Sequence, residues 1–427
     1  VLHDLAEFYD SYFQTFITDS DVFTDEKILK VLGLISFFFS IDRSDKKFYD
    51  ELLSDFEINH YEFTEACVHL ERLELLESTA DNTIIRISDQ VLSAYFFYRV
   101  FLKEKLLDFS KLLSNYFERY PNRFRDTLIP ANNDFGYQKV LQPIREELSS
   151  YLNSIITYQR KVHAFLDIFW FYLNEETFAF IYSQVEHLPV LKNPQLVLDK
   201  KNNNPRWNED KNVKLISNFF YSSVPGIVTA IEIMLEYVAR KPETYQQAFQ
   251  KFTEAFGFSY EDERYSFYRQ NKFIDLLTKN ASKRNPVYLQ LFFDLLPALL
   301  KTDFTVHGGS WKKNTVSFYH YHLPASQPSF RIRNKLWKQL DKVYELDKAR
   351  AEEAVYEYIT PKDYVKEILQ AELPQLLKII KKYFSPESFL NCYFVQKLIQ
   401  RYISIGITHP GFDALKNQYY SKSYKTF

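Results

Sequence analysis

The chain has 427 residues, of which 46% are hydrophobic and 25% charged, and its formal net charge is −2 at pH 7. With so little net charge, there is no global electrostatic attraction to nucleic acid or to an anionic membrane surface. The 8 glycines form neither a P-loop pattern nor a G-x-G-x-x-G pattern, so we expect no phosphate-cradling nucleotide site built by these residues alone.

Cysteine usage and hydropathy together predict a cytoplasmic protein. Cys67 and Cys392 lie in apolar helical patterns without a CxxC neighbour, which is typical of structural thiols in a reducing compartment. The longest apolar stretch, residues 28–41, is too short to span a bilayer, and no signal peptide opens the chain. Because the only methionine is Met234, we expect the chain to be part of a larger protein.

The first quarter of the chain is predicted to hold a small helical module. Residues 1–21 have apolar side chains three or four positions apart, which predicts a linker helix. Residues 22–103 are predicted to form a winged-helix-like domain that ends in an apolar junction helix, residues 91–102. Its earlier elements are three helices and a β-hairpin, expected over residues 25–39, 45–56, 61–73, 75–78 and 84–87.

A long helical region is predicted from residue 104 to residue 300. Short connections between amphipathic helices favour an irregular α-solenoid, that is a helical-repeat array, or a bundle. We find no clean repeat period, and the polar stretch 200–205 reads as a surface loop. The expected helices cover residues 106–119, 134–155, 160–172, 175–186, 210–221, 225–239, 243–255, 260–279 and 285–300.

A β-hairpin insertion, residues 301–330, interrupts the helices, because residues 303–323 alternate like two strands around Gly308-Gly309. Helices resume in a C-terminal helical region, residues 331–427. The fold class is therefore mostly α: a winged-helix-like N-terminal module, then an irregular solenoid with one hairpin. Aromatic residues reach 18%, so we expect a core packed by rings.

A winged helix can bind DNA by placing its third helix in the major groove. Here that helix, residues 60–72, carries Glu62, Glu65 and Glu71 against a single arginine, Arg72. Phosphate would be repelled by this charge. We therefore expect no binding to nucleic acid, although a DNA-binding regulator stays the third hypothesis for the chain.

Three histidines fall on the predicted hairpin: His307, His320 and His322. The last two share a face because strand side chains alternate, and could approach a metal. Asp303 is the only carboxylate nearby, and histidines on exposed hairpins are common. We expect no metal, no cofactor and no catalytic constellation in this chain, so it is not expected to be an enzyme; whether these histidines bind anything stays open.

A basic cluster near the hairpin is the candidate patch for a partner. Cationic side chains alternate there with tryptophan, which suits contact with phosphate or an acidic protein surface. Solubilising charge beside a core aromatic residue is the alternative. The candidate partner-binding residues are Trp311, Lys312, Lys313, Arg331, Arg333 and Lys335.

The segment from Leu29 to Leu102 resembles the winged-helix region that follows the ATPase core in STAND NTPases, particularly the bacterial antiviral type. The resemblance is carried by residues 30–38, by the hairpin and by residues 87–98, where a Ser-Asp-Gln cap precedes a helix rich in Tyr and Phe. It covers about a quarter of the chain. The helical remainder is similar to the sensor arms of that family in architecture only.

This resemblance implies a signal-transduction ATPase whose nucleotide domain precedes Val1 and whose helical arm recognises a trigger, such as a phage protein, with oligomerisation on activation. The module would then need an apolar face to dock on the ATPase core. The candidate docking residues are Phe37, Phe38, Asp89, Gln90, Tyr95 and Tyr98.

The first hypothesis is thus a non-catalytic regulatory and ligand-sensing region of a STAND-like ATPase. The second is a free-standing helical-repeat scaffold for a protein partner.

Overall fold

The computed structural model describes residues 24–199, except 80 and 82, and residues 209–222, 224–310, 315–358 and 364–423. This part of the chain is mostly helical, with small antiparallel sheets, which confirms the predicted mostly α class. The predicted linker helix, residues 1–21, lies outside the described residues. The chain divides into two compact units, with the division after Ala179. The division falls inside the helical region that the sequence predicted as one stretch.

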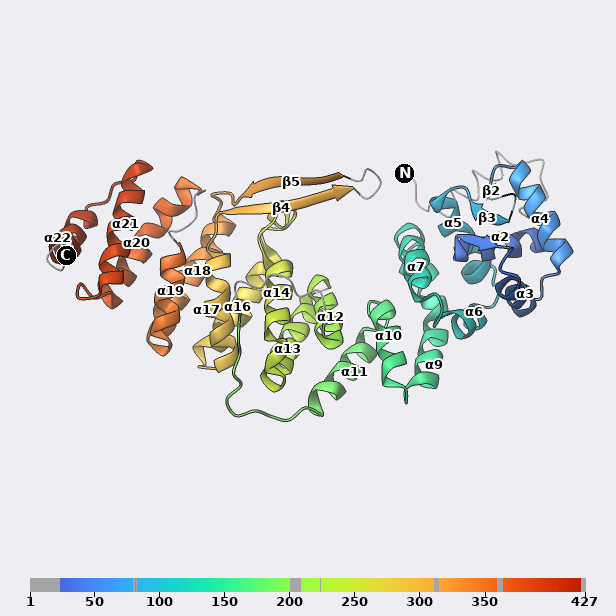
Figure 1. The fold of residues 1–427 in the computed structure, drawn as a ribbon, viewed down its shortest axis with the longest axis horizontal. Coiled ribbons are helices and arrows are strands. Elements are labelled where there is room, and N and C mark those ends of the chain that lie inside the picture. Colours follow the sequence, from blue (N-terminus) through green and yellow to red (C-terminus); the bar gives the residue numbers. More distant parts are fainter. Residues whose placement is uncertain are drawn as a thin grey trace. The chain divides into compact units, whose positions relative to one another are not determined.

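Unit 1 begins with the elements predicted for its N-terminal module, in the predicted order (Figure 1). A short strand, β1, was not predicted; at three residues it is too short for alternation to be seen. It pairs antiparallel with β3, and β3 pairs antiparallel with β2. The elements are α2 (Glu26–Phe38), β1 (Ser40–Asp42), α3 (Lys46–Asp55), α4 (His60–Arg72), β2 (Leu76–Thr79) and β3 (Ile84–Ile87).

The helices of this module start at side-chain caps, which satisfy amide groups that lack a partner within the helix. Asp25 accepts hydrogen bonds from the N–H groups of Lys27 and Ile28. Asn59 and Glu62 form a complete capping box at the start of α4. The sequence therefore sets these helix boundaries locally.

The predicted apolar junction helix is present, but only its first half is α-helical. α5 (Gln90–Phe97) continues into the π-helical segment η2 (Tyr98–Lys103). After it, unit 1 contains α6 (Phe109–Tyr116), α7 (Pro121–Phe135), α8 (Tyr137–Val140), η3 (Gln142–Ile144), α9 (Arg145–Ile155), α10 (Gln159–Phe169) and the first part of α11 (Asn174–Glu186).

Gly33, in the buried middle of α2, lets η2 approach closely. A Cβ atom at this position would lie 2.5 Å from Cγ1 and 2.7 Å from Cβ of Val100. We expect Gly33→Ala to lower the free energy of unfolding by about 1–3 kcal/mol, because overpacking forces neighbouring side chains to shift. Urea denaturation measures this loss.

Val100→Ala removes the two methyl groups that lie 2.5 and 3.0 Å from the added Cβ, although its own Cβ at 2.7 Å stays, and it provides the control. The double variant should lose less stability than the sum of the two single variants, since the added and removed atoms occupy the same space. A neutral Gly33→Ala variant would contradict this close packing.

Unit 2 contains most of the helices and the predicted hairpin (Figure 1). Helices contact near neighbours in the chain: α16 contacts α17 and α18, α17 contacts α19, and α18 contacts α20. The elements after α11 are α12 (Lys211–Asn218), η4 (Phe219–Tyr221), α13 (Val224–Arg240), η5 (Pro242–Thr244), α14 (Tyr245–Phe256), α15 (Tyr260–Arg264), α16 (Tyr268–Ser282), α17 (Pro286–Leu299), β4 (Asp303–Ser310), β5 (Thr315–His322), α18 (Gln327–Val343), η7 (Tyr344–Leu346), α19 (Lys348–Tyr358), α20 (Lys366–Tyr383), α21 (Phe389–Ser404) and α22 (Gly411–Ser423).

The hairpin pairs in register from Asp303 opposite His322 to Ser310 opposite Thr315. Its base packs through aromatic rings on the connection between α14 and α15. The ring of Phe304 lies 5.8 Å from that of Phe258 and 6.3 Å from that of Tyr321. The alternation of residues 303–323 therefore predicted a strand pair correctly. The base of this pair is held by the aromatic contact with Phe258.

Candidate functional site

The predicted docking residues of the first helix are part of the core of unit 1. Phe37 is fully buried, and its ring lies 4.9 Å from that of Phe38 and 4.7 Å from that of Phe124. The ring of Phe38 in turn lies 5.4 Å from that of Phe48. Rings of the same unit enclose both side chains, so they form no open docking face.

The docking residues predicted on the junction helix also form no open docking face. Tyr95 and Tyr98 are buried, and the ring of Tyr98 stacks on that of Phe135 at 4.4 Å. Asp89 caps α5 by accepting hydrogen bonds from the next turn. The side chain of Gln90 lies outside the described residues. The apolar run that looked like a docking surface is explained by packing within the unit and by a helix cap.

Of the predicted basic patch, Arg331, Arg333 and Lys335 lie among the described residues, and these three do not form one exposed surface. Trp311, Lys312 and Lys313 lie outside the described residues. Arg331 is exposed, and Lys335 forms an ion pair with Asp275 at 2.6 Å. Arg333 contradicts the prediction: only 1% of it is exposed.

Arg333 instead forms a buried ion pair with Glu372 of α20. The two bonds of its guanidinium group to this carboxylate measure 2.6 and 2.9 Å. The remaining N–H groups donate to carbonyl oxygens at the C-terminal end of α17, including that of Leu300 at 2.9 Å. Tyr358 donates a hydrogen bond to the same carboxylate at 2.6 Å. The guanidinium therefore caps α17 and joins it to α20, because a buried charge must be fully paired.

The hairpin histidines meet a single carboxylate. Nδ1 of His322 lies 3.0 Å from Asp303, and Nδ1 of His320 lies 3.3 Å from the same side chain. Both rings are mostly exposed, as expected for one face of the hairpin. The side chain of His307 lies outside the described residues. Within the described part of the chain, no group of three His, Cys, Asp or Glu side chains is placed to hold a metal ion.

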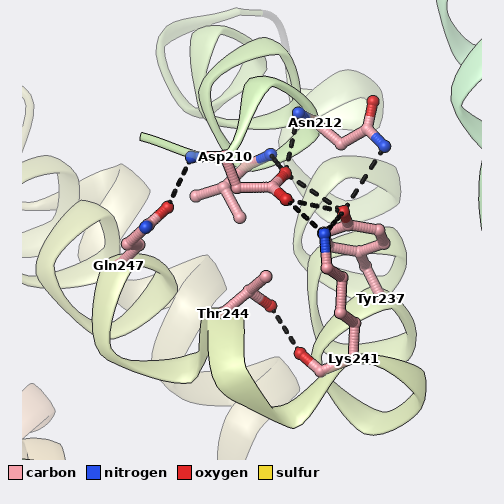
Figure 2. Close-up of polar contacts among 7 residues, drawn as sticks. Asp210, Asn212, Tyr237, Lys241, Thr244 and Gln247 are labelled. Atoms are coloured by element: carbon pink, nitrogen blue, oxygen red, sulfur yellow. Dashed lines mark hydrogen bonds and ion pairs between the residues drawn. The ribbon is translucent and has the colours of Figure 1, made fainter. Parts of the chain in front are cut away.

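A second polar cluster surrounds Asp210, at the start of α12 (Figure 2). Its carboxylate accepts hydrogen bonds from the N–H groups of Asn212 and Val213, from the Tyr237 hydroxyl at 3.0 Å and from Lys241 Nζ at 2.7 Å. Burial would raise the pKa of Asp210, but these hydrogen bonds lower it. Burial would lower the pKa of Lys241, but Asp210 raises it. Both charges are thus stabilised, and the cluster ties α12 to α13.

The third helix of the N-terminal module keeps an acidic, apolar surface. Glu62 forms an ion pair with Lys27 at 2.6 Å, while Glu65 and Val68 are exposed. Tyr61 is 72% exposed. This surface has no excess of positive charge with which to bind phosphate.

A groove beside α21 is the best candidate site in unit 2. It has a volume of about 720 Å³ and is lined mainly by α21, with Tyr356 of α19 at its side. Its apolar end is open, with Leu390 61% and Tyr393 53% exposed. The lining residues are Tyr356, Leu390, Tyr393, Phe394, Lys397, Gln400, Arg401 and Ser404.

Charge in the groove is positive and is placed next to aromatic rings. Lys397 Nζ lies 5.5 Å from the centre of the Tyr393 ring, and the guanidinium of Arg401 lies 5.3 Å from that of Tyr364. None of the described residues that line the groove carries a carboxylate. The groove therefore combines apolar surface with the positively charged side chains of Lys397 and Arg401 along its lining.

Sequence reasoning missed this site, although α21 carried a signal for it. Its buried residues, such as Val395 and Leu398, account for the core-facing side. Phe389, Leu390 and Tyr393 fall outside that set and repeat at helical spacing, so the helix has apolar residues on a second side. A helix of this kind has more apolar surface than one core can cover.

No protein-family model, curated protein or solved structure matches the chain. Among the described helices, none is both long and apolar enough to cross a membrane.

Proposed function

We propose that this chain is a non-catalytic recognition region that binds a protein partner through the groove between α19 and α21. The observation that supports it is the exposed apolar end of the groove, formed by Leu390 and Tyr393, beside Lys397 and Arg401. Exposed apolar surface in a concave site, with polar and charged groups beside it, is typical of interaction sites.

The partner segment that fits is an amphipathic helix with apolar side chains at one end and carboxylates at the other. A helix can lay two apolar side chains, one turn apart, against Leu390 and Tyr393. Its carboxylates then meet Lys397 and Arg401, which disfavours basic segments through like-charge repulsion.

This role agrees with the sensor arm that the resemblance to STAND NTPases implies. The proposed location of the protein is the cytoplasm. In that case the full-length open reading frame encodes a P-loop domain before Val1. An open reading frame without one would favour the second hypothesis, a free-standing helical-repeat scaffold.

A display library of helical peptides, selected on the whole chain, tests the proposed groove. We expect the selected peptides to carry apolar residues at i and i+4, followed by Asp or Glu. Leu390→Asp should weaken their binding at least about tenfold, since the lost burial of one leucine is worth about 1.5 kcal/mol or more. Fluorescence anisotropy gives the dissociation constants.

Ile403→Asp is the matched control, because Ile403 is also an exposed aliphatic residue of α21, 47% exposed, but does not line the groove. It should leave the affinity within about twofold, as expected for a position outside the contact. Selection of lysine-rich peptides, or equal binding to both variants, would refute the proposed groove.

A further inference from the structure

The connection between α11 and α12 is long and follows unit 2 without a helix or strand in its described residues, 188–199 and 209–210 (Figure 1). Connections of this length are uncommon in compact proteins, and they are usually either functional segments or linkers. Side chains from three helices hold its backbone. The path of its described residues is therefore fixed by the helices of unit 2.

The centre of the connection is held by two glutamines. Oε1 of Gln246, on α14, accepts a hydrogen bond from the N–H of Asp199 at 2.8 Å, and its Nε2 donates to the carbonyl oxygen of Asp199 at 3.3 Å. Nε2 of Gln290, on α17, donates to the carbonyl oxygen of Leu196 at 2.9 Å. A side-chain amide that pairs with both backbone groups of one residue acts like a neighbouring strand.

The side chains between these contacts alternate in burial. Leu196 is 8% exposed and Val197 is 73% exposed, whereas Leu198 is again partly buried. Alternate side chains of an extended chain point in opposite directions. Residues 196–199 therefore lie on unit 2 as an extended peptide with every second side chain facing the helices.

Both ends of the connection are anchored separately. Nη1 of Arg240 donates to the carbonyl oxygen of Leu188 at 3.1 Å. At the other end, the N–H of Asp210 donates to Oε1 of Gln247 at 2.7 Å, next to the Asp210–Lys241 ion pair (Figure 2). The central peptide can thus leave the helices while the ends stay attached.

We propose that the face formed by Gln246 of α14 and Gln290 of α17 is a binding site for extended peptides, which the chain's own residues 196–199 occupy. The partner is an extended segment with leucine or a similar aliphatic residue at alternate positions. Backbone hydrogen bonds supply affinity for any sequence, and the alternate side chains supply specificity. This site is separate from the groove between α19 and α21 and does not rest on it.

The test uses a dye-labelled synthetic peptide with the sequence of residues 193–199. In the intact chain the internal segment competes at an effective concentration in the millimolar range, so the added peptide binds weakly. The variant Leu196→Asp/Leu198→Asp releases the internal segment. We expect this variant to bind the peptide at least about tenfold more tightly than the unmodified chain, because the internal competitor is removed.

Two controls test whether the peptide binds at the proposed site. Adding Gln246→Ala and Gln290→Ala to the released variant should abolish binding, and a peptide with both leucines replaced by serine should bind much more weakly, because it keeps only the backbone hydrogen bonds. Equal affinity for the released and unmodified chains, or binding that survives loss of both glutamines, would overturn the proposal.

A second measurement needs no substitution. Hydrogen exchange of the unmodified chain, followed by mass spectrometry, should show faster exchange in residues 194–199 when the peptide is added at millimolar concentration. The N–H of Asp199 then loses its bond to Gln246. Unchanged exchange at saturating peptide would also overturn the proposal.

Discussion

Arg333→Met should lower the free energy of unfolding of unit 2 by about 3–5 kcal/mol, because it leaves the carboxylate of Glu372 buried without its partner. Arg333 is 1% exposed and Glu372 5% exposed. The substitution also removes the donors that cap the C-terminal carbonyl groups of α17. Urea denaturation followed by circular dichroism measures the loss.

Lys335→Met is the matched control, since Lys335 belongs to the same helix and to the same predicted patch. Its ion pair with Asp275 is partly exposed on both sides, and such pairs contribute roughly 0.2–1 kcal/mol. Similar small losses for both variants would mean that Arg333 is not the buried ion-pair residue described above.

The double variant Arg333→Met/Glu372→Met separates the loss of the pair from the cost of an unpaired charge. Replacement of a buried ion pair by apolar residues of similar volume is often close to neutral. We therefore expect the double variant to be more stable than Arg333→Met alone. A double variant that is less stable than Arg333→Met alone would show that most of the lost stability comes from the ion pair itself rather than from the unpaired carboxylate.

Phe37→Ala should lower the free energy of unfolding of unit 1 by about 3–5 kcal/mol, the usual cost of removing a buried phenylalanine ring. Phe37 is fully buried and touches the rings of Phe38, Phe97 and Phe124. A docking residue on an open face would instead leave the stability of this chain almost unchanged. Thermal and urea denaturation of the variant distinguish these outcomes.

Phe39→Ala provides the control two positions along the chain. Phe39 is 39% exposed, and the guanidinium group of Arg123 lies 5.3 Å from the centre of its ring. We expect a loss of about 1 kcal/mol or less, as for an exposed cation–π contact. If both substitutions lowered the free energy of unfolding equally, burial would not explain the contribution of Phe37 to stability.

Local patterns in the sequence were enough to predict the types and order of most elements. Alternation over residues 303–323 predicted the hairpin β4–β5, and the helical periodicity of apolar residues predicted the helices of the N-terminal module. α7 was missed because Pro130 and a run of polar residues weaken its helical pattern. The predicted helix over 134–155 is broken at Gly136, whose φ of 85° ends α7.

The sites depended on contacts that no local pattern contains. Arg333 and Lys335 look alike in sequence, yet the partner of Arg333 is Glu372, 39 residues away, and the partner of Lys335 is Asp275. Gln246 contacts Asp199 across 47 residues. Neither the buried ion pair nor the peptide-like connection could be read from spacing.

The sequence by itself therefore determined three features. Periodicity predicted the mostly helical fold class, alternation predicted the hairpin, and the glycine content excluded a glycine-rich phosphate loop, because each of these depends only on neighbouring residues. Only the tertiary structure decided which apolar side of each helix is covered and which charge is buried. Phe37 became core, Leu390 stayed exposed and Arg333 paired internally, since burial depends on which distant segments pack against a residue rather than on its own type.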